Sequence, residues 1–151
     1  MNEKRIVAAI TLTLILFFVF FSSTSVGKLK VTIIAKGGLE VKATIIDLKV
    51  YSFNWENITD EINLTFTNKS ETLTVLLPTG NYNKVKFRIV NALINLNGNL
   101  TSLKVFQEEF IIESNFTIKL MKETKMIIEL RYDEELLTQQ TLNLTAEIFI
   151  S

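Results

Sequence analysis

The sequence predicts an all-β fold, a single β-sandwich preceded by one apolar N-terminal helix. Apolar and polar residues alternate with a period of two from Lys28 almost to the end of the chain, which is the pattern of half-buried strands. Turn residues interrupt this alternation at short intervals, which indicates about eight to ten short strands. No stretch after Lys28 shows a convincing helical period.

The first element is an apolar segment, residues 1–27, ahead of a domain of residues 28–151. Lys4 and Arg5 precede the apolar run 6–21, and small polar residues follow at Ser22–Ser25. A basic start, an apolar centre and a small-residue end are typical of a secretory signal peptide. The remaining residues are enough for one domain with one core.

Two readings of this segment stay open. A peptidase would cleave after Ser25 or after Gly27, whereas an uncleaved run of residues 6–26 nears the length of a bilayer span. The positive end stays in the cytoplasm in both cases, so the domain is exported. A pilin-type signal is disfavoured because Arg5 stands where such signals usually have a small residue.

The first half of the domain is expected to contain four strands. Gly37-Gly38 ends the first strand, and the second changes its apolar phase at Ile45-Ile46, which indicates a bulge or a strand covered on both faces. Asn54 to Asp60 is predicted to be a polar loop around Trp55. The expected strands are 28–36, 41–53, 61–67 and 73–77, with a turn at Asn68-Lys69-Ser70.

A turn at Pro78-Thr79-Gly80 is expected to be structural and to start a long hairpin strand. Proline fixes φ at a value that suits a turn, and Gly80 can adopt positive φ. The following strand changes phase near Val90-Asn91, and Asn97-Gly98 is a strong tight-hairpin signal. Further strands are predicted within 103–112, interrupted at 107–109, and at 116–120, 126–132 and 142–150, with a short loop or helical turn at 133–140.

The composition argues against several functions. The 16 basic and 16 acidic residues cancel, so no nucleic-acid partner is expected. Cysteine and histidine are absent, which removes thiol nucleophiles and the commonest general base. The acidic clusters Asp60-Glu61, Glu108-Glu109 and 133–135 lack the spacing of a calcium loop. We therefore expect no catalytic residue, cofactor or metal site.

The strongest chemical signal is a set of N-glycosylation acceptors. Chance predicts about two N-x-S/T sequences for this composition, and more than that occur. Each falls on a predicted loop, strand edge or polar face, where a sugar can be accommodated. The six acceptors are Asn57, Asn63, Asn68, Asn99, Asn115 and Asn143.

The segments Gly27-Lys-Leu-Lys-Val-Thr-Ile33, Ile45-Ile-Asp-Leu-Lys-Val-Tyr51 and Leu76-Leu-Pro-Thr-Gly-Asn-Tyr82 resemble a family of exported bacterial and archaeal domains of unknown function. That family is grouped with the prealbumin-like (transthyretin-like) sandwiches. The likeness runs from Gly27 to about Ile150, and only the Leu-Pro-x-Gly-x-Tyr turn is distinctive. The chain departs from the family in its shortened loop after Phe53 and in lacking a lipoprotein cysteine. The resemblance implies fold and export, and it brings no catalytic residues.

Together these observations predict a non-enzymatic glycoprotein domain, anchored at the cell surface or secreted, with a structural or adhesive role. One version is a filament subunit, in which the strand 142–150 pairs with the sheet edge of another molecule. The alternative is an extracellular ligand- or carbohydrate-binding module that uses Trp55.

Overall fold

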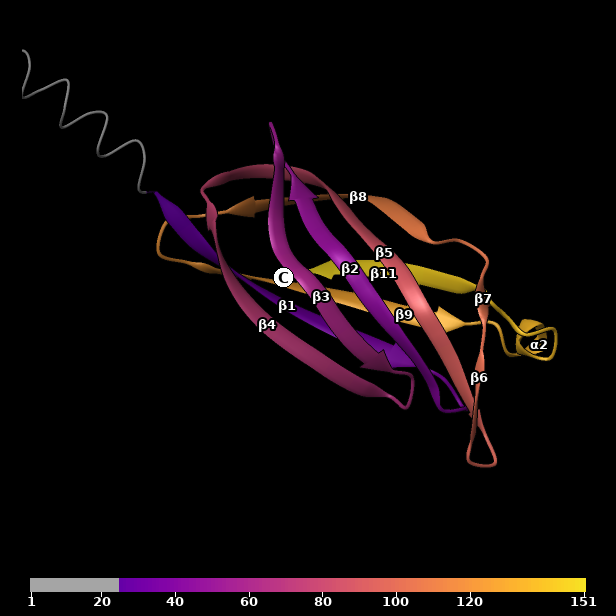
Figure 1. Cartoon of the computed structure of the whole chain (residues 1–151). Coiled ribbons are helices and arrows are strands. Elements are labelled where there is room, and N and C mark those ends of the chain that lie inside the picture. Colours follow the sequence, from indigo (N-terminus) through magenta and orange to yellow (C-terminus); the bar gives the residue numbers. More distant parts are fainter. Residues whose placement is uncertain (1–24) are drawn as a thin grey trace, which may run out of the picture.

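The computed structural model describes residues 25–151, and it is an all-β structure with two main sheets (Figure 1). The predicted N-terminal helix lies outside these residues. The described part contains strands β1 to β11, of which β7 and β10 have two residues each, and one short helix, α2. This is close to the eight to ten strands that the turn spacing predicts.

The first sheet has the strand order β11-β9-β1-β4. β1 pairs in parallel with β9 and antiparallel with β4, while β11 pairs antiparallel with β9. The outer strands β11 and β4 are therefore the two edges of this sheet. The bounds are β1 Val26–Lys36, β4 Lys69–Pro78, β9 Glu123–Tyr132 and β11 Leu144–Ile150.

The second sheet is built around the 17-residue strand β5. β2 pairs along one side of β5, and β3 pairs with the outer side of β2. On its other side β5 pairs with β8 through its first half and with β6 through its last residues. The bounds are β2 Val41–Tyr51, β3 Trp55–Thr65, β5 Gly80–Leu96, β6 Asn99–Ser102 and β8 Glu109–Ile118.

A small parallel pair joins β7 (Lys104–Val105) to β10 (Thr141–Leu142), close to helix α2 (Glu134–Leu137). Asp133 caps this helix by accepting a hydrogen bond from the backbone of Glu135. The helical turn predicted after Tyr132 is thus confirmed.

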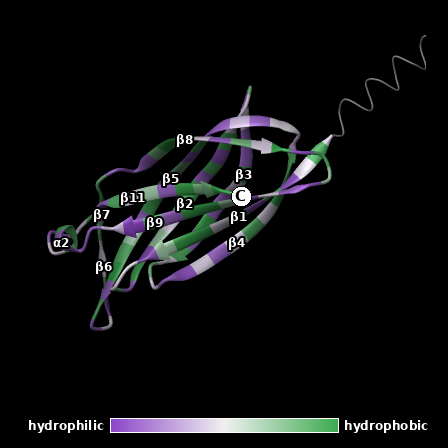
Figure 2. Ribbon diagram, turned by 180° about the vertical axis from the view of Figure 1, so that it is seen from behind, coloured by the Kyte–Doolittle hydropathy of each residue, from purple (hydrophilic) through white to green (hydrophobic). Residues whose placement is uncertain are grey.

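The apolar faces of the two sheets form one hydrophobic core. Leu29, Val31 and Ile33 of β1 are fully buried, and their neighbours on the strand are more exposed. The same alternation places Met126 and Ile128 of β9 inside, and Figure 2 shows it as green and purple bands along the strands. Each such side chain contributes about 1.5–3 kcal/mol by leaving water. The arrangement is consistent with a β-sandwich.

Both predicted changes of phase are present as bulges. In β2 the buried residues switch from Ile45 to Leu48, and Asp47 between them has φ 55°. In β5 they switch from Ile89 to Ala92, with Asn91 at φ 54°. Both places also show a shift in the pairing register between β2 and β5, because the extra residue has no partner across the ladder.

The predicted loop from Asn54 to Asp60 is wrong. Only 52–54 form the loop, and β3 begins at Trp55. Trp55 stands opposite Tyr51 across the hairpin, with the ring centroids 5.1 Å apart, and Ile58 is buried in the core. The polar residues that suggested a loop occupy the solvent-facing side of an edge strand.

Three other boundaries differ from the prediction. β8 continues through Glu109–Ile118 without a break, and Leu120 lies beyond it in a turn with 56% of its surface exposed. The turn before β4 ends at Asn68, which has φ 58°. β1 begins at Val26, ahead of the predicted boundary at residue 28. The hairpin at Asn97-Gly98 is confirmed, with φ of 53° and 87°.

Candidate functional site

The six glycosylation acceptors lie at the surface of the domain. Asn57 and Asn63 lie on the solvent-facing side of β3, and the others lie on or beside four other strands. Five of the six are exposed, and Asn143 is half-buried. The structure scatters the acceptors around the domain, so they do not form a single pocket.

Their positions relative to the sheets share one property. β3 is one edge of the second sheet, while β6 and β8 form its other edge. β4 and β11 are the edges of the first sheet. Every acceptor lies on one of these edge strands or directly before it, and none lies on the interior strands β1, β2, β5 or β9: Asn57 and Asn63 on β3, Asn68 before β4, Asn99 on β6, Asn115 on β8 and Asn143 before β11.

The hydrogen bonds of two acceptors are compatible with modification. Asn57 donates through Nδ2 to Asp60 at 2.9 Å, and Asn63 donates through Nδ2 to Glu61 at 3.5 Å. An amide carries two N–H groups, so a sugar on Nδ2 would leave one donor for the carboxylate. Thr44 in addition donates to the side-chain oxygen of Asn63 at 2.9 Å, which helps to hold this amide on the sheet.

The turn at Pro78 and Gly80 connects the two sheets, so the expected hairpin is wrong. Pro78 ends β4 in the first sheet, and Gly80 begins β5 in the second. Gly80 has φ 156°, a conformation that is nearly restricted to glycine. The hydroxyl of Tyr82 donates to the backbone oxygen of Pro78 at 2.9 Å. This bond fixes the corner, as similar tyrosines do in other sandwiches.

Burial, followed by the charge of Glu56, raises the pKa of Tyr82. Its ring stacks on Phe116 of β8, with centroids 5.2 Å apart and planes 12° apart. The sequence motif includes Tyr82, but the pattern alone did not indicate what its hydroxyl binds.

The same crossover holds the beginning of the described chain. Thr79 donates to Ser25 from its backbone nitrogen at 3.0 Å and from Oγ1 at 3.1 Å. Val26 is already paired with Pro78. A side chain at Gly27 would collide with the backbone of Lys119 in the turn after β8. Residues 25–27 are therefore an integral part of the folded domain.

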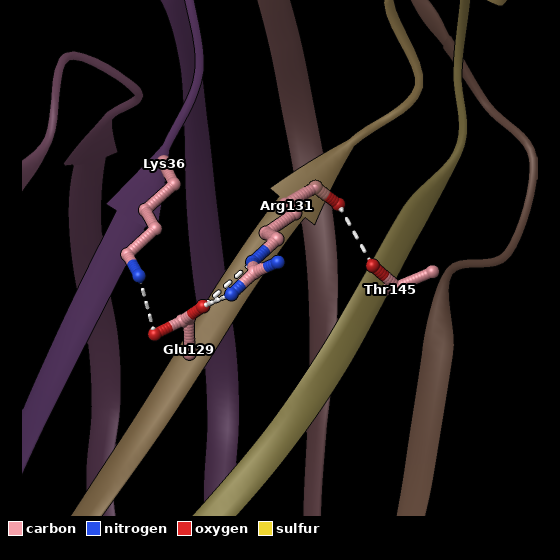
Figure 3. A network of polar contacts seen from close by, with 4 residues as sticks. All are labelled: Lys36, Glu129, Arg131 and Thr145. Carbon is pink, nitrogen blue, oxygen red and sulfur yellow. Dashed lines mark hydrogen bonds and ion pairs between the residues drawn. The ribbon is translucent and has the colours of Figure 1, made fainter.

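A charged cluster on the outer face of the first sheet was not singled out by the sequence (Figure 3). Glu129 of β9 is 8% exposed and lies 2.7 Å from Lys36 Nζ of β1. Its other oxygen accepts from Arg131 Nε at 2.6 Å, and the backbone oxygen of Arg131 accepts from Thr145 of β11 at 3.5 Å. The hydrogen bonds from Lys36 and then Arg131 lower the pKa of Glu129. The cluster joins three neighbouring strands.

Trp55 lies on the outer face of the second sheet. Lys86 Nζ is 5.1 Å from the centroid of the Trp55 ring, and Lys84 Nζ is 5.9 Å from that of Tyr51. Trp55 is 38% exposed. The side chains of Tyr51, Trp55, Lys84 and Lys86 form an aromatic and basic strip on this face.

The acidic clusters have partners other than a metal. Asp60 accepts from Asn57, Asp133 caps α2, and Glu109 pairs with Lys86 at 3.8 Å. Among residues 25–151 no group of three or more acidic, histidine or cysteine side chains is placed to hold a metal ion. The same residues contain no helix with the length and apolar character needed to cross a membrane.

No family model matches the chain, and no match is found among curated proteins or among solved structures. The resemblance to prealbumin-like domains therefore remains a prediction based on its sequence motifs.

Proposed function

We propose that this chain is an exported, non-enzymatic glycoprotein domain with a structural or adhesive role, which its uncleaved apolar segment holds at the cell surface. The expected span of residues 6–26 is too long by its last two residues, because Ser25 and Val26 belong to the folded domain. The fold of the domain is proposed to be a prealbumin-like sandwich, as the Leu-Pro-x-Gly-x-Tyr corner and the two sheets of four and five strands suggest. Export supplies the compartment in which the acceptors meet a glycosylation system.

The distribution of the acceptors carries this proposal. An open sheet edge presents unpaired N–H and C=O groups that can pair with another chain. A glycan beside each edge would block this pairing sterically. Asparagines on the interior strand β5 (Asn81, Asn83, Asn91, Asn95) are not followed by the acceptor pattern. Glycans at the sheet edges would increase the solubility of a surface domain where its local concentration is high.

The attachment of the domain is the second part of the proposal. Residues 25–27 are bound into the fold through Thr79, Pro78 and the turn after β8. Cleavage after Gly27 would remove part of β1 and both hydrogen bonds from Thr79 to Ser25. A retained segment keeps these contacts, which favours the anchor over release.

Glycopeptide mapping of protein from the native host tests the glycan assignment. We expect Asn63 and Asn99, which are exposed, to be occupied, together with Asn143 beside β11. The variant Thr65→Val removes the acceptor pattern at Asn63, and Thr65→Ser keeps it as a matched control. If all three asparagines are bare in the native protein, the glycoprotein assignment is wrong.

Removing the glycans should also expose the edges. A variant lacking the patterns on β3, with Thr59→Val and Thr65→Val, should self-associate more than its Thr→Ser counterpart, as measured by sedimentation at equal concentrations. Equal association of the two variants would contradict the shielding role. A filament subunit would instead require an open edge at β11, so that this strand can pair with another molecule. An ordered polymer of protein in which Asn143 carries no glycan would therefore favour the filament version.

The ligand-binding alternative rests on the strip of Tyr51, Trp55, Lys84 and Lys86. An aromatic surface beside ammonium groups can stack on a sugar or bind an anionic ligand. In the structure, lysines lie over both rings, so a ligand must displace them. Quenching of the fluorescence of the single tryptophan by acidic oligosaccharides would support this alternative. If these oligosaccharides cause no quenching, the structural or adhesive role is favoured.

A further inference from the structure

One end of the domain is defined by the contacts around Ser25, and we call it the junction end. It contains Ser25, the β2–β3 loop 52–54, the crossover 78–80 and the β8–β9 turn 119–122. Thr79 is hydrogen-bonded to Ser25, and Lys28 donates to the backbone oxygen of Lys122 at 3.0 Å. Ser52 Oγ lies 3.9 Å from the place of a Cβ on Gly80. The β5–β6 hairpin lies at the opposite end of the strands (Figure 1).

The junction end carries the two most exposed large apolar side chains of the described residues. Met121 is 93% exposed and Phe53 is 92% exposed, and Leu120 beside Met121 is 56% exposed. Met121 has φ 54°, a conformation for which glycine or asparagine is the usual choice. An apolar residue is thus displayed at the tip of a tight turn.

Lysines flank this apolar pair. The turn is Lys119-Leu120-Met121-Lys122, and Lys28 lies beside it on β1. The far end of the domain instead carries the acidic start of α2, with Glu134 and Glu135 in its first turn. Apolar side chains between long basic ones suit a bilayer interface, where apolar atoms enter the headgroup region and ammonium groups stay at the phosphates.

The sequence places this turn next to the proposed anchor. Only residues 22–24 separate the end of the apolar run at Phe21 from Ser25. The four peptide units from Phe21 to Ser25 span about 15 Å at most, and Ser25 is bound to Thr79, so the connection is short. A chain anchored by the apolar run that ends at Phe21 therefore has its junction end within about 15 Å of the hydrocarbon core.

We propose that the junction end lies on the bilayer surface, with Leu120 and Met121 inserted at the interface and Lys119 and Lys122 at the headgroups. Phe53 of the second sheet makes a second contact with the same surface. This inference rests on the proposed retention of residues 6–26. The lipid surface then fixes the orientation of the domain, and the far end with Asn99 faces away from the membrane.

The absence of cysteine from the chain allows a direct test. The full-length protein is reconstituted into vesicles of phosphatidylcholine and phosphatidylglycerol, with a fluorophore on one introduced cysteine. Leu120→Cys and Leu100→Cys are a matched pair, because the two leucines are 56% and 58% exposed and lie at opposite ends. Quenching by nitroxides on the lipid chains is measured for both, and a melting curve in detergent shows that each variant is folded.

We expect strong quenching at residue 120 and little at residue 100, and the variant Lys119→Glu with Lys122→Glu should reduce quenching at residue 120. Equal, weak quenching at both positions in protein that floats with the vesicles would overturn the membrane contact and leave the anchor in place. Failure of the full-length chain to float would overturn both. Weak quenching at residue 120 that rises on dilution of the protein within the lipid would show that the apolar turn meets a second copy instead.

Discussion

Tyr82 illustrates how one residue determines where the chain changes sheets. Its hydroxyl is bonded to Pro78 and its ring is buried against Phe116. Tyr82→Phe removes the bond and leaves the backbone oxygen without this donor. We expect a loss of about 1 kcal/mol in the free energy of unfolding, measured by urea denaturation. Tyr51→Phe, on the outer face, is the control and should change it much less.

The raised pKa of Tyr82 adds a dependence on pH. A group whose pKa is higher in the folded state stabilises the fold below the pKa of the unfolded chain, and this stability is lost as pH rises through the folded value. Wild-type protein should therefore lose stability in the alkaline range more steeply than Tyr82→Phe. Parallel curves for the two proteins would contradict the burial of this phenol.

Gly80 makes a separate prediction at the same corner. Its φ of 156° is accessible to glycine and strained for a β-branched residue. Gly80→Val should cost about 1–3 kcal/mol of stability, visible as a lower melting temperature. Glu71→Val, an exposed position of β4, controls for the added side chain. An unchanged melting temperature for Gly80→Val would show that the crossover does not need glycine.

At the scale of elements, the parallel pair β1 and β9 is reinforced by the cluster around Glu129. A lowered pKa means that the stabilisation is fully present above the pKa of the unfolded carboxyl and is lost as pH falls through the folded value. Glu129→Gln should be less stable near neutral pH and should show a flatter loss of stability on acidification than the wild type. Chemical denaturation at a series of pH values measures this.

Glu147→Gln serves as the matched control, because Glu147 stands opposite Glu129 on β11 and is exposed. Its stability should follow the pH dependence of the wild type. If Glu129→Gln also follows it, the charged cluster does not contribute to the acid response.

Strand periodicity made most elements predictable, and long-range contacts decided the rest. Leu29 to Ala35 and Met126 to Tyr132 alternate so regularly that their buried faces follow from the sequence. The bulges at Asp47 and Asn91 left a visible change of phase. The sequence does not indicate a strand from Trp55 to Asp60, because the polar residues of this segment face solvent on an edge strand. The pairing with β2 in the structure identifies it as part of β3.

The candidate sites were predictable to different degrees. The six acceptors are a local pattern and could be read directly. Their relation to the sheet edges depends on strand order, which no local pattern contains. The predicted strand 116–120 includes Leu120, because Leu120 continues the alternation of Phe116 and Ile118, whereas the structure ends β8 at Ile118. The lysines on both sides were the available signal for a turn.

At the scale of the whole molecule, three features are consistent with a domain that is held at a membrane surface. The apolar segment is connected to the domain at Ser25, the turn with Leu120 and Met121 lies at the same end of the domain as Ser25, and the acceptors line the sheet edges. A surface protein with this plan would stand on the membrane and present glycans to its surroundings. Retention of the apolar segment and glycosylation of the acceptors both change the mass of the protein, so a single mass measurement can test these two features together.

That measurement is the intact mass of the protein purified from native membranes, taken before and after chemical deglycosylation. The unmodified chain has a mass of 17.2 kDa. We expect a higher native mass that falls to about that of the unmodified chain after deglycosylation, because residues 6–26 are retained and the glycans are removed. A native mass below 17.2 kDa that deglycosylation leaves unchanged would show a cleaved, unmodified domain and contradict the proposed function.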